Sequence, residues 1–457
     1  MIVNSIANYS VHNTSLNSNN NTVKAASQNM QTSSSVQVPF NGIFPDIFFK
    51  KFNTPEEKAM YKELNAVLSG KDKANLDILY KTGKLSNNDS NDKTSTLHNL
   101  YKIYTEPRIV GLDNKKVLSE TLARIADPFT ITQRFGKIPD KVATQVLEEY
   151  KADEALSKQK FAPKNKNDMD IKNSASCVAA SIEFSLADKK PAEFARMVAG
   201  LSGQEASVVQ NVKLENLNKN VLDAFALLKM FNVNPEKSDW QSATIRIKPD
   251  RDAIVRARVQ NTYCDGKNRS SVDVLMQSAF MQLGSQSTYN SLTDKRYGSL
   301  NTNDTGLTEF EKTFVESVVN NDGEKTSMVY QDVDDKAVLK GYTHPPEVVK
   351  QHILTTLANN QNVIVGITET DGNKRIIGGH EITIVASKEK NGELYFVCND
   401  TDDNYSGPIE VKAEILIPKI HHAGIPVSVV EVKDTSTDRG QDLLKQYSQK
   451  SNAAVPA

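Results

Sequence analysis

The spacing of the apolar residues changes along the chain, and this change constrains the fold more than any other feature. Between about residues 50 and 160, apolar residues recur every three to four positions, as in "KKVLSETLARIADP" and "IPDKVATQVLEEYKADEALSK", which predicts helices. After Pro345 and one more helical segment come "NVIVGITET", "EITIVASKE" and "ELYFVCND", which predict strands. Helices and strands that separate along a chain are typical of an α+β protein.

Turn and cap residues refine this outline. Thr54, Pro55 and Glu57 have the spacing of a helix start. Asn391-Gly392 lies between the last two predicted strands and predicts a hairpin turn. Further strands are expected at "SATIRIKP", "AIVRARVQ", "KAEILIP" and "PVSVVEVK".

Composition divides the chain into four segments. Residues 1–37 are rich in Asn and Ser and poor in large apolar side chains, so we expect a disordered leader. Residues 38–160 form a helical N-terminal subdomain, residues 161–432 the main α+β domain, and residues 433–457 a flexible C-terminal tail. Trp240 is expected to be a packing anchor.

The overall charge and the cysteines exclude several classes of protein. Lys plus Arg number 55 and Asp plus Glu 56, so no nucleic-acid surface is indicated. The three cysteines have neither a disulfide nor a zinc spacing. No apolar run reaches the ~20 residues of a membrane span, and no classical signal peptide is recognisable. We therefore expect a soluble protein, cytoplasmic or exported by a non-classical route; its oligomeric state stays open.

One cysteine lies where a loop becomes a helix, in "NSASCVAASIEFSLA". Ser174 and Ser176 are candidate N-caps, and an apolar stripe begins at Val178. Cys177 therefore falls in the first helical turn, where unpaired N–H groups and the helix dipole lower a thiol pKa. A small buried hydrophobic residue is the alternative interpretation.

One histidine has a setting that suits a general base. His380 follows Gly378 and Gly379 and opens a predicted strand. Ile382 and Ile384 share its face, so His380 lies at the edge of a core. A satisfied structural histidine is the alternative.

An imidazole that serves a thiol needs an acceptor on its second nitrogen, commonly Asn or Asp. Asn399 and Asp400 end the partner strand. A strict two-residue turn pairs His380 with Asp403, whereas an earlier turn brings Asn399 opposite. We favour Asn399, followed by Asp400 and then Asp402, and the register stays open.

These residues together resemble the papain-like cysteine peptidase superfamily over about residues 170–432. "SCVAASIEFSLA" is similar to that family's Ser-Cys-aromatic-Ala-x-Ser helix, "GGHEITIVA" to its Gly-His-Ala strand, and "LYFVCND" to its asparagine strand. The resemblance implies a papain-like fold and a catalytic domain over residues 161–432. It also implies that Cys177 is the nucleophile, His380 the general base and acid, and Asn399 the orienting residue.

The chain departs from that pattern at three places. Val178 replaces the aromatic residue, "DTDD" follows the asparagine, and Ile171 stands where the family has a glutamine that supplies the oxyanion donor. Asn173, or the backbone N–H of Cys177 with another amide, is the candidate donor.

The expected function is thiol-dependent cleavage of peptide or isopeptide bonds in a protein or peptide substrate, without a metal or organic cofactor. Two alternatives use the same residues: acyl transfer, as in transglutaminase-like or peptidoglycan-directed relatives, and an inactive papain-like effector. Of the remaining cysteines, Cys264 is expected in a loop and Cys398 in a core.

Overall fold

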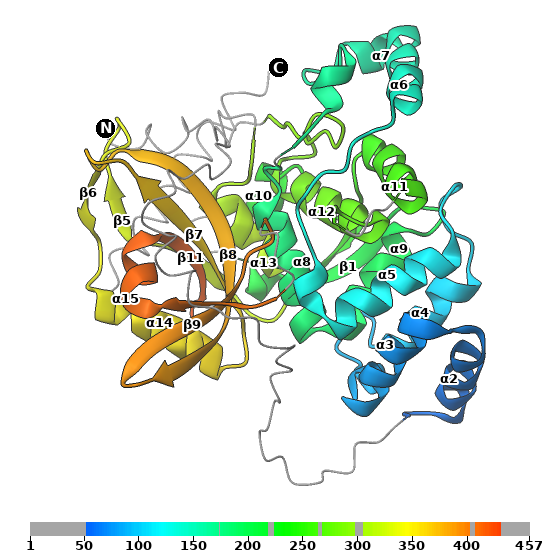
Figure 1. Cartoon of the computed structure of the whole chain (residues 1–457), viewed down its shortest axis with the longest axis horizontal. Coiled ribbons are helices and arrows are strands. Elements are labelled where there is room, and N and C mark those ends of the chain that lie inside the picture. Colours follow the sequence, from blue (N-terminus) through cyan, green and yellow to red (C-terminus); the bar gives the residue numbers. More distant parts are fainter. Residues whose placement is uncertain are drawn as a thin grey trace, which may run out of the picture.

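The separation of helical and strand patterns along the chain is reproduced in space. The computed structural model describes residues 52–172, 174–217, 224–263, 267–297, 305–402 and 407–430. These residues form an α+β structure in which a lobe of helices lies beside an antiparallel sheet (Figure 1). Among the described helices, none combines the length and apolar character needed to cross a lipid bilayer.

The helical lobe forms around one continuous core. Its first helix starts as the sequence predicts, with the Thr54 hydroxyl accepting from the backbone N–H of Glu57 at 3.2 Å. Buried apolar side chains from Leu64 to Val319 make one cluster, which also takes in Ile364 from the sheet. The helices of this lobe are α2 (Pro55–Val67), α3 (Gly70–Lys81), α4 (Thr96–Thr105), α5 (Asn114–Ala126), α8 (Cys177–Lys189), α9 (Pro191–Leu201), α10 (Ala224–Met230), α11 (Arg251–Tyr263) and α12 (Ser271–Gly284).

Smaller elements complete this lobe. A projecting pair, α6 (Asp140–Ala152) and α7 (Glu154–Ser157), has its own small apolar cluster. A three-stranded sheet has the order β1 (Val208–Lys213), β3 (Ser242–Ile247) and β2 (Lys237–Ser238). Short 3₁₀ turns include η2 (Lys84–Ser86), η3 (Pro128–Thr130), η4 (Lys166–Met169) and η5 (Leu214–Asn216).

The second lobe is a six-stranded antiparallel sheet in the order β10-β9-β8-β7-β11-β4. Its strands are β4 (Lys325–Val329), β7 (Val363–Thr370), β8 (Ile376–Lys390), β9 (Glu393–Asn399), β10 (Ile409–Lys412) and β11 (Ile420–Pro426). A separate hairpin is formed by β5 (Gln331–Val333) and β6 (Leu339–Tyr342). The predicted Asn391-Gly392 turn joins β8 to β9, with both residues at positive φ.

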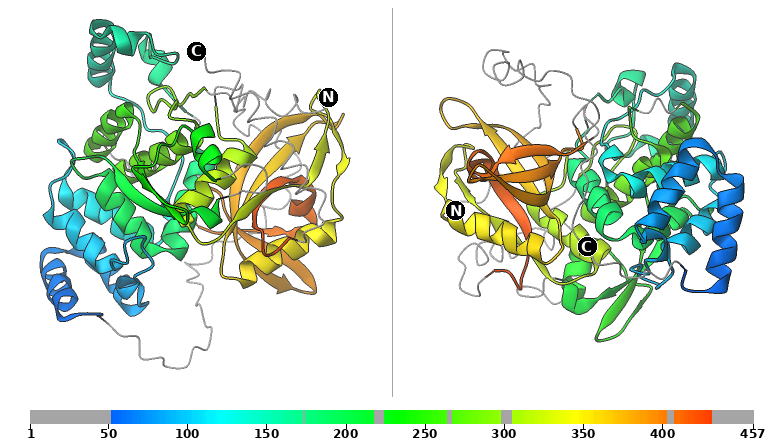
Figure 2. Two further views of the ribbon diagram at one scale, coloured as in Figure 1. Left: turned by 180° about the vertical axis from the view of Figure 1, so that it is seen from behind. Right: turned by 60° about the horizontal axis from the view of Figure 1, so that its bottom comes forward.

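The two faces of the sheet join different cores. One face carries Ile382 and Ile384 and packs with α14 (Pro346–Ala358), α15 (Ala413–Leu416) and the turn η6 (Ile417–Lys419) in a second apolar cluster. The other face contacts α8 and α13 (Glu309–Asn320), where Ile364 enters the core of the helical lobe. Figure 2 shows the same division of helices and sheet from two further sides.

Helix α13 links the lobes through buried ion pairs. Four of its charged side chains are buried, and three of them have an oppositely charged partner outside the helix, two of these partners on strands of the sheet. These pairs are Glu311 with Arg296 at 2.5 Å, Lys312 with Glu381 of β8 at 3.2 Å, and Glu316 with Lys325 of β4 at 2.9 Å.

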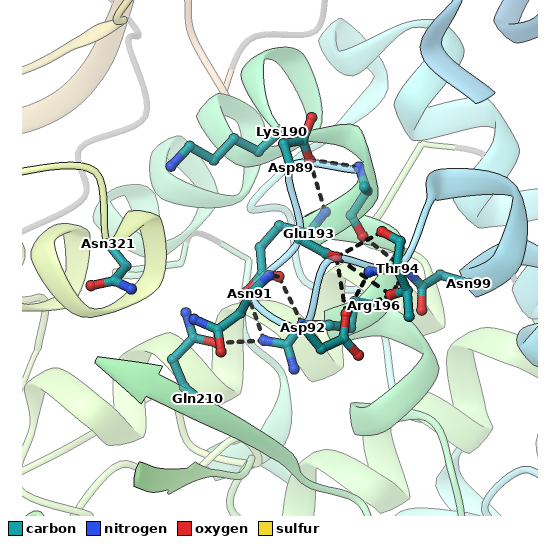
Figure 3. A network of polar contacts seen from close by, with 12 residues as sticks. Asp89, Asn91, Asp92, Thr94, Asn99, Lys190, Glu193, Arg196, Gln210 and Asn321 are labelled. Carbon is teal, nitrogen blue, oxygen red and sulfur yellow. Dashed lines mark hydrogen bonds and ion pairs between the residues drawn. The ribbon is translucent and has the colours of Figure 1, made fainter. Parts of the chain in front are cut away.

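A polar network fixes the loop between η2 and α4 onto α9 (Figure 3). The Asp89 carboxylate accepts from the backbone N–H groups of Ala192 and Glu193, at 3.1 and 3.2 Å, in the first turn of α9. The Glu193 carboxylate accepts from the backbone N–H of Asn91 at 2.8 Å and pairs with Arg196 at 2.7 Å. The N-terminal helices are thereby joined to α9 by polar contacts as well as by apolar packing.

The strand predicted at "AIVRARVQ" is wrong, because this segment belongs to α11. Ala253 and Ala257 are buried one helical turn apart, and Arg256 between them is also buried. Its guanidinium donates to the backbone carbonyls of Ser291 and Gly136, among others. A buried arginine on an inner helix face produced the strand-like alternation.

The strand predicted at "KAEILIP" is wrong, and the one predicted at "PVSVVEVK" is displaced toward the N-terminus. The first segment forms α15 and η6, and the second begins at the last residue of β11, with residues 431–433 outside the described part. Short apolar runs do not distinguish a strand from a helical turn. The expected packing role of Trp240 is also wrong, since its side chain is 96% exposed.

Candidate active site

Cys177 lies where a buried helix reaches the surface. α8 begins at Cys177 with Ser176 as its N-cap, and the residues from Val178 to Ala187 are all buried. Cys177 itself is partly exposed. The N–H groups of a first helical turn have no intrahelical partners, and the helix dipole favours an anion there. A thiolate and an oxyanion would both find stabilising N–H groups at this position.

The loop before Cys177 is held by side chains from distant parts of the helical lobe. The Asp294 carboxylate accepts from the backbone N–H of Ala175 at 2.6 Å. The Ser176 hydroxyl donates to the Gln277 side-chain oxygen at 3.0 Å. Asp294 and Gln277 are not recognisable from the sequence, because each follows the cysteine loop by 100 residues or more.

His380 lies between Cys177 and an aspartate. Its Nε2 is 2.7 Å from Oδ1 of Asp400, and the two side chains are 26% and 24% exposed. The Cys177 side chain lies close enough to the imidazole to interact with it and to affect its pKa. The three side chains therefore form one chain of contacts, although they come from α8, β8 and the residue after β9.

This arrangement favours the charged forms of both His380 and Asp400. Burial lowers the pKa of His380, but hydrogen bonds and charge interactions with Asp400 and Cys177 raise it well above its ordinary value. Burial raises the pKa of Asp400, but His380 and the backbone N–H of Asp402 lower it below its ordinary value. A protonated imidazole beside an ionised carboxylate is the arrangement expected in a site that stabilises a thiolate.

Asn399, the favoured orienting residue, does not reach His380. Asn399 pairs with Thr383 across the hairpin, and residues directly opposite each other project from the same face of a sheet. Side chains alternate along a strand, so His380 projects from the other face, which it shares with Asp400. Asn399 is buried, and its side-chain nitrogen has no hydrogen-bond partner among the described atoms.

The remaining candidates have varied positions. The backbone N–H of Asp402 donates to Oδ1 of Asp400 at 3.0 Å, so Asp402 helps to hold the carboxylate that contacts His380. Asn173, the candidate oxyanion donor, and Cys264 lie outside the described residues. Cys398 is fully buried in the sheet core, as predicted, and burial raises the pKa of its thiol to about 12. Cys398 therefore has the properties of a packing residue.

The residue after His380 anchors the strand from the opposite face. Glu381 is buried and pairs with Lys312 at 3.2 Å and with His422 at 2.7 Å. Burial raises the pKa of Glu381, but the interactions with Lys312 and His422 outweigh this effect and lower the pKa to about 2. This contact fixes β8 immediately beside the imidazole, and no local sequence pattern indicates it.

No family model matches the chain, and no curated protein or solved structure matches it significantly.

The chemistry of the site follows from its own side chains. Across the described ranges, no group of three or more His, Cys, Asp or Glu side chains is arranged to hold a metal ion. The groups present are a partly exposed thiol, an imidazole in contact with it, and a carboxylate on the second side of the imidazole. Such an arrangement can perform nucleophilic attack with proton transfer to and from the imidazole.

Proposed function

We propose that the protein is a papain-like cysteine hydrolase that cleaves peptide or isopeptide bonds. The observation that carries the proposal is the contact chain from Cys177 through His380 to Asp400. It is supported by the division of the site between a helical lobe that supplies the cysteine at a helix N-terminus and an antiparallel sheet that supplies the other two groups.

In the proposed reaction, the Cys177 sulfur attacks the carbonyl carbon of the scissile bond and forms a tetrahedral intermediate. The backbone N–H groups at the start of α8 stabilise the oxyanion. Protonated His380 then gives its proton to the leaving amine as the C–N bond breaks, which leaves a thioester on Cys177.

A water molecule completes the cycle. Neutral His380 takes a proton from this water, whose oxygen attacks the thioester carbonyl. The C–S bond breaks, the acid product leaves, and the thiolate and imidazolium are restored. Asp400 holds the imidazole orientation through both steps, the role that Asn or Asp has in related constellations.

The test is cleavage of a complex peptide library by the full-length protein, with new ends identified by mass spectrometry. Cleavage that is lost in Cys177→Ala and in His380→Ala, with both variants folded, would support the proposal. A nucleophilic amine added at high concentration would show whether the thioester is captured by water or by an amine.

Thiol reactivity tests the site without a substrate. Cys177 should react with iodoacetamide near neutral pH faster than Cys264 and Cys398, because it is partly exposed at a helix N-terminus and lies beside the His380 imidazole. Equal rates for the three cysteines in the folded protein would exclude the proposed nucleophile.

A further inference from the structure

A short segment of the N-terminal helical region passes between the two halves of the candidate site. Thr132 and Gln133 follow η3 and precede α6, in a stretch without regular secondary structure. They are more than 40 residues from the cysteine loop and more than 260 residues from the end of β9. We call these two residues the strap.

On one side the strap binds Thr401, the residue after Asp400. The backbone carbonyl of Thr401 accepts from the Gln133 N–H at 3.1 Å and from the Thr132 hydroxyl at 3.0 Å. The Thr401 hydroxyl donates to Oε1 of Gln133 at 2.9 Å. Three hydrogen bonds therefore fix the backbone that carries the Asp400 carboxylate.

On its other side the strap binds the loop before Cys177. Nε2 of Gln133 donates to the backbone carbonyl of Ser174 at 3.3 Å. The backbone carbonyl of Thr132 accepts from Nε2 of Gln277 at 2.9 Å, and the same Gln277 side chain accepts from the Ser176 hydroxyl at 3.0 Å. The strap thus contacts residues on both sides of the catalytic contact chain.

Burial makes these bonds costly to lose. Gln133 and Thr401 are each only 2% exposed, and a buried polar group that loses its partner bears its full desolvation penalty. Because the Gln133 amide bonds to both sides, a change in this side chain alters the position of Thr401 relative to Ser174.

We propose that Gln133 is a positioning residue that sets the Asp400–His380 pair at its working distance from Cys177. The inference rests on the proposed function, since it assigns a task within that site. Gln133 touches none of the reacting atoms and acts through Thr401 and Ser174.

The test measures the rate of Cys177 alkylation by iodoacetamide in the full-length protein. Thr401→Val removes the hydroxyl donor and keeps the side-chain shape and the backbone bonds. Gln133→Met removes the amide at similar length. Both should slow alkylation by about 10- to 100-fold, the effect of a small misplacement in a catalytic site.

Three comparisons separate positioning from general destabilisation. Thr401→Ser restores the donor and should react within about twofold of the wild-type rate. Thr130→Val, which removes an exposed hydroxyl bonded to the Asp127 carbonyl next to the strap, should leave the rate unchanged. The double variant Gln133→Met/Thr401→Val should be no slower than the slower single variant, because both changes break the same bond.

Two results would overturn the inference: wild-type alkylation rates in folded Thr401→Val and Gln133→Met, or equal slowing by Thr401→Ser and Thr401→Val. If Gln133→Met does not fold, Thr401→Val with its serine control decides alone. His380→Ala separates this inference from the proposed function. If His380→Ala reacts at the wild-type rate, the proposed site itself is wrong. If His380→Ala is slow but Thr401→Val and Gln133→Met are not, only the role of the strap is wrong.

Discussion

Asp400 and His380 project from the same face of the sheet, and their side chains meet at 2.7 Å. This contact predicts different effects on activity for substitutions at Asp400 and at its neighbour Asn399. Asp400→Asn should lower kcat/KM by on the order of 10²- to 10⁴-fold, because the imidazole loses its ionised partner. Asn399→Ala should keep activity within about tenfold, because the Asn399 side chain projects from the sheet face opposite to that of His380. Steady-state kinetics on one cleaved peptide would measure both, and a larger loss in Asn399→Ala would contradict this assignment.

The imidazole of His380 should titrate above its ordinary pKa of 6.5, since contacts with Asp400 and Cys177 outweigh the effect of burial. Its stabilising contribution is therefore complete below pH 6.5 and is lost as the pH rises through the raised folded pKa. NMR titration of the His380 ring protons would measure this pKa. Cys177→Ala should lower it, because one of the groups that raise it is gone; an unchanged titration would show that the two residues do not interact.

The buried pair of Lys312 and Glu381 should be sensitive to loss of one partner. Lys312→Met removes the lysine partner of the buried Glu381 carboxylate, which keeps its contact with His422, and should destabilise the fold by about 3–5 kcal/mol. Lys312→Met/Glu381→Gln removes both charges and should recover much of that loss. Urea unfolding at neutral pH measures both variants, and equal destabilisation by the two would mean that the charges are not coupled.

The lowered pKa of Glu381 also predicts how the stability of the fold changes at acid pH. The pKa of Glu381 is lowered from 4.5 to about 2. Its contribution to stability is therefore present above pH 4.5 and is lost as the pH falls toward 2. The difference in unfolding free energy between the wild type and Glu381→Gln should shrink over this range.

Trp240 provides a simple optical check, since it is the one tryptophan of the chain. With 96% of its side chain exposed, its emission should resemble that of tryptophan in water and should be quenched readily by iodide. Trp240→Ala should change the unfolding free energy by less than about 0.5 kcal/mol. Strong protection from quenching would place the indole in a contact that this structure does not contain.

The helical N-terminal region should not be separable from the rest. A fragment that begins near residue 160 would lose the strap and expose the core that runs from Leu64 to Ile364. We expect this fragment to aggregate, as measured by light scattering during expression and refolding. A soluble fragment more active than the full chain would instead identify the region as an inhibitory prosegment.

The comparison of sequence and structure is most instructive in the β8–β9 hairpin. The Asn391-Gly392 turn is predictable from the sequence and takes the expected position. From that turn alone, Asn399 would pair with Ile384 and share the face of His380. The structure contains a register shift between Ile384 and Ala386, and one inserted residue moves every later partner to the other face. "Ile-Val-Ala" contains no glycine or proline that would indicate a bulge.

The position of Cys177 was predictable from the sequence, whereas the residues that hold its loop were not. Cys177 could be placed at a helix start because small polar residues precede an apolar stripe, a local pattern. The partners that hold its loop could not, because Gln133, Gln277 and Asp294 come from separate parts of the fold. Arg256 illustrates the same limit, since its burial depends on four carbonyl groups that only the assembled chain brings together.

The position of β11 determines when the sheet can be completed in a newly synthesised chain. β11 is the last described strand in sequence, yet it lies inside the sheet between β7 and β4. At about 5–20 residues per second, the ribosome needs on the order of 10–50 s to proceed from Cys177 to the end of β11. During that interval the thiol already exists, while the sheet that carries His380 lacks an inner strand. The proposed site would therefore be completed only near the end of synthesis.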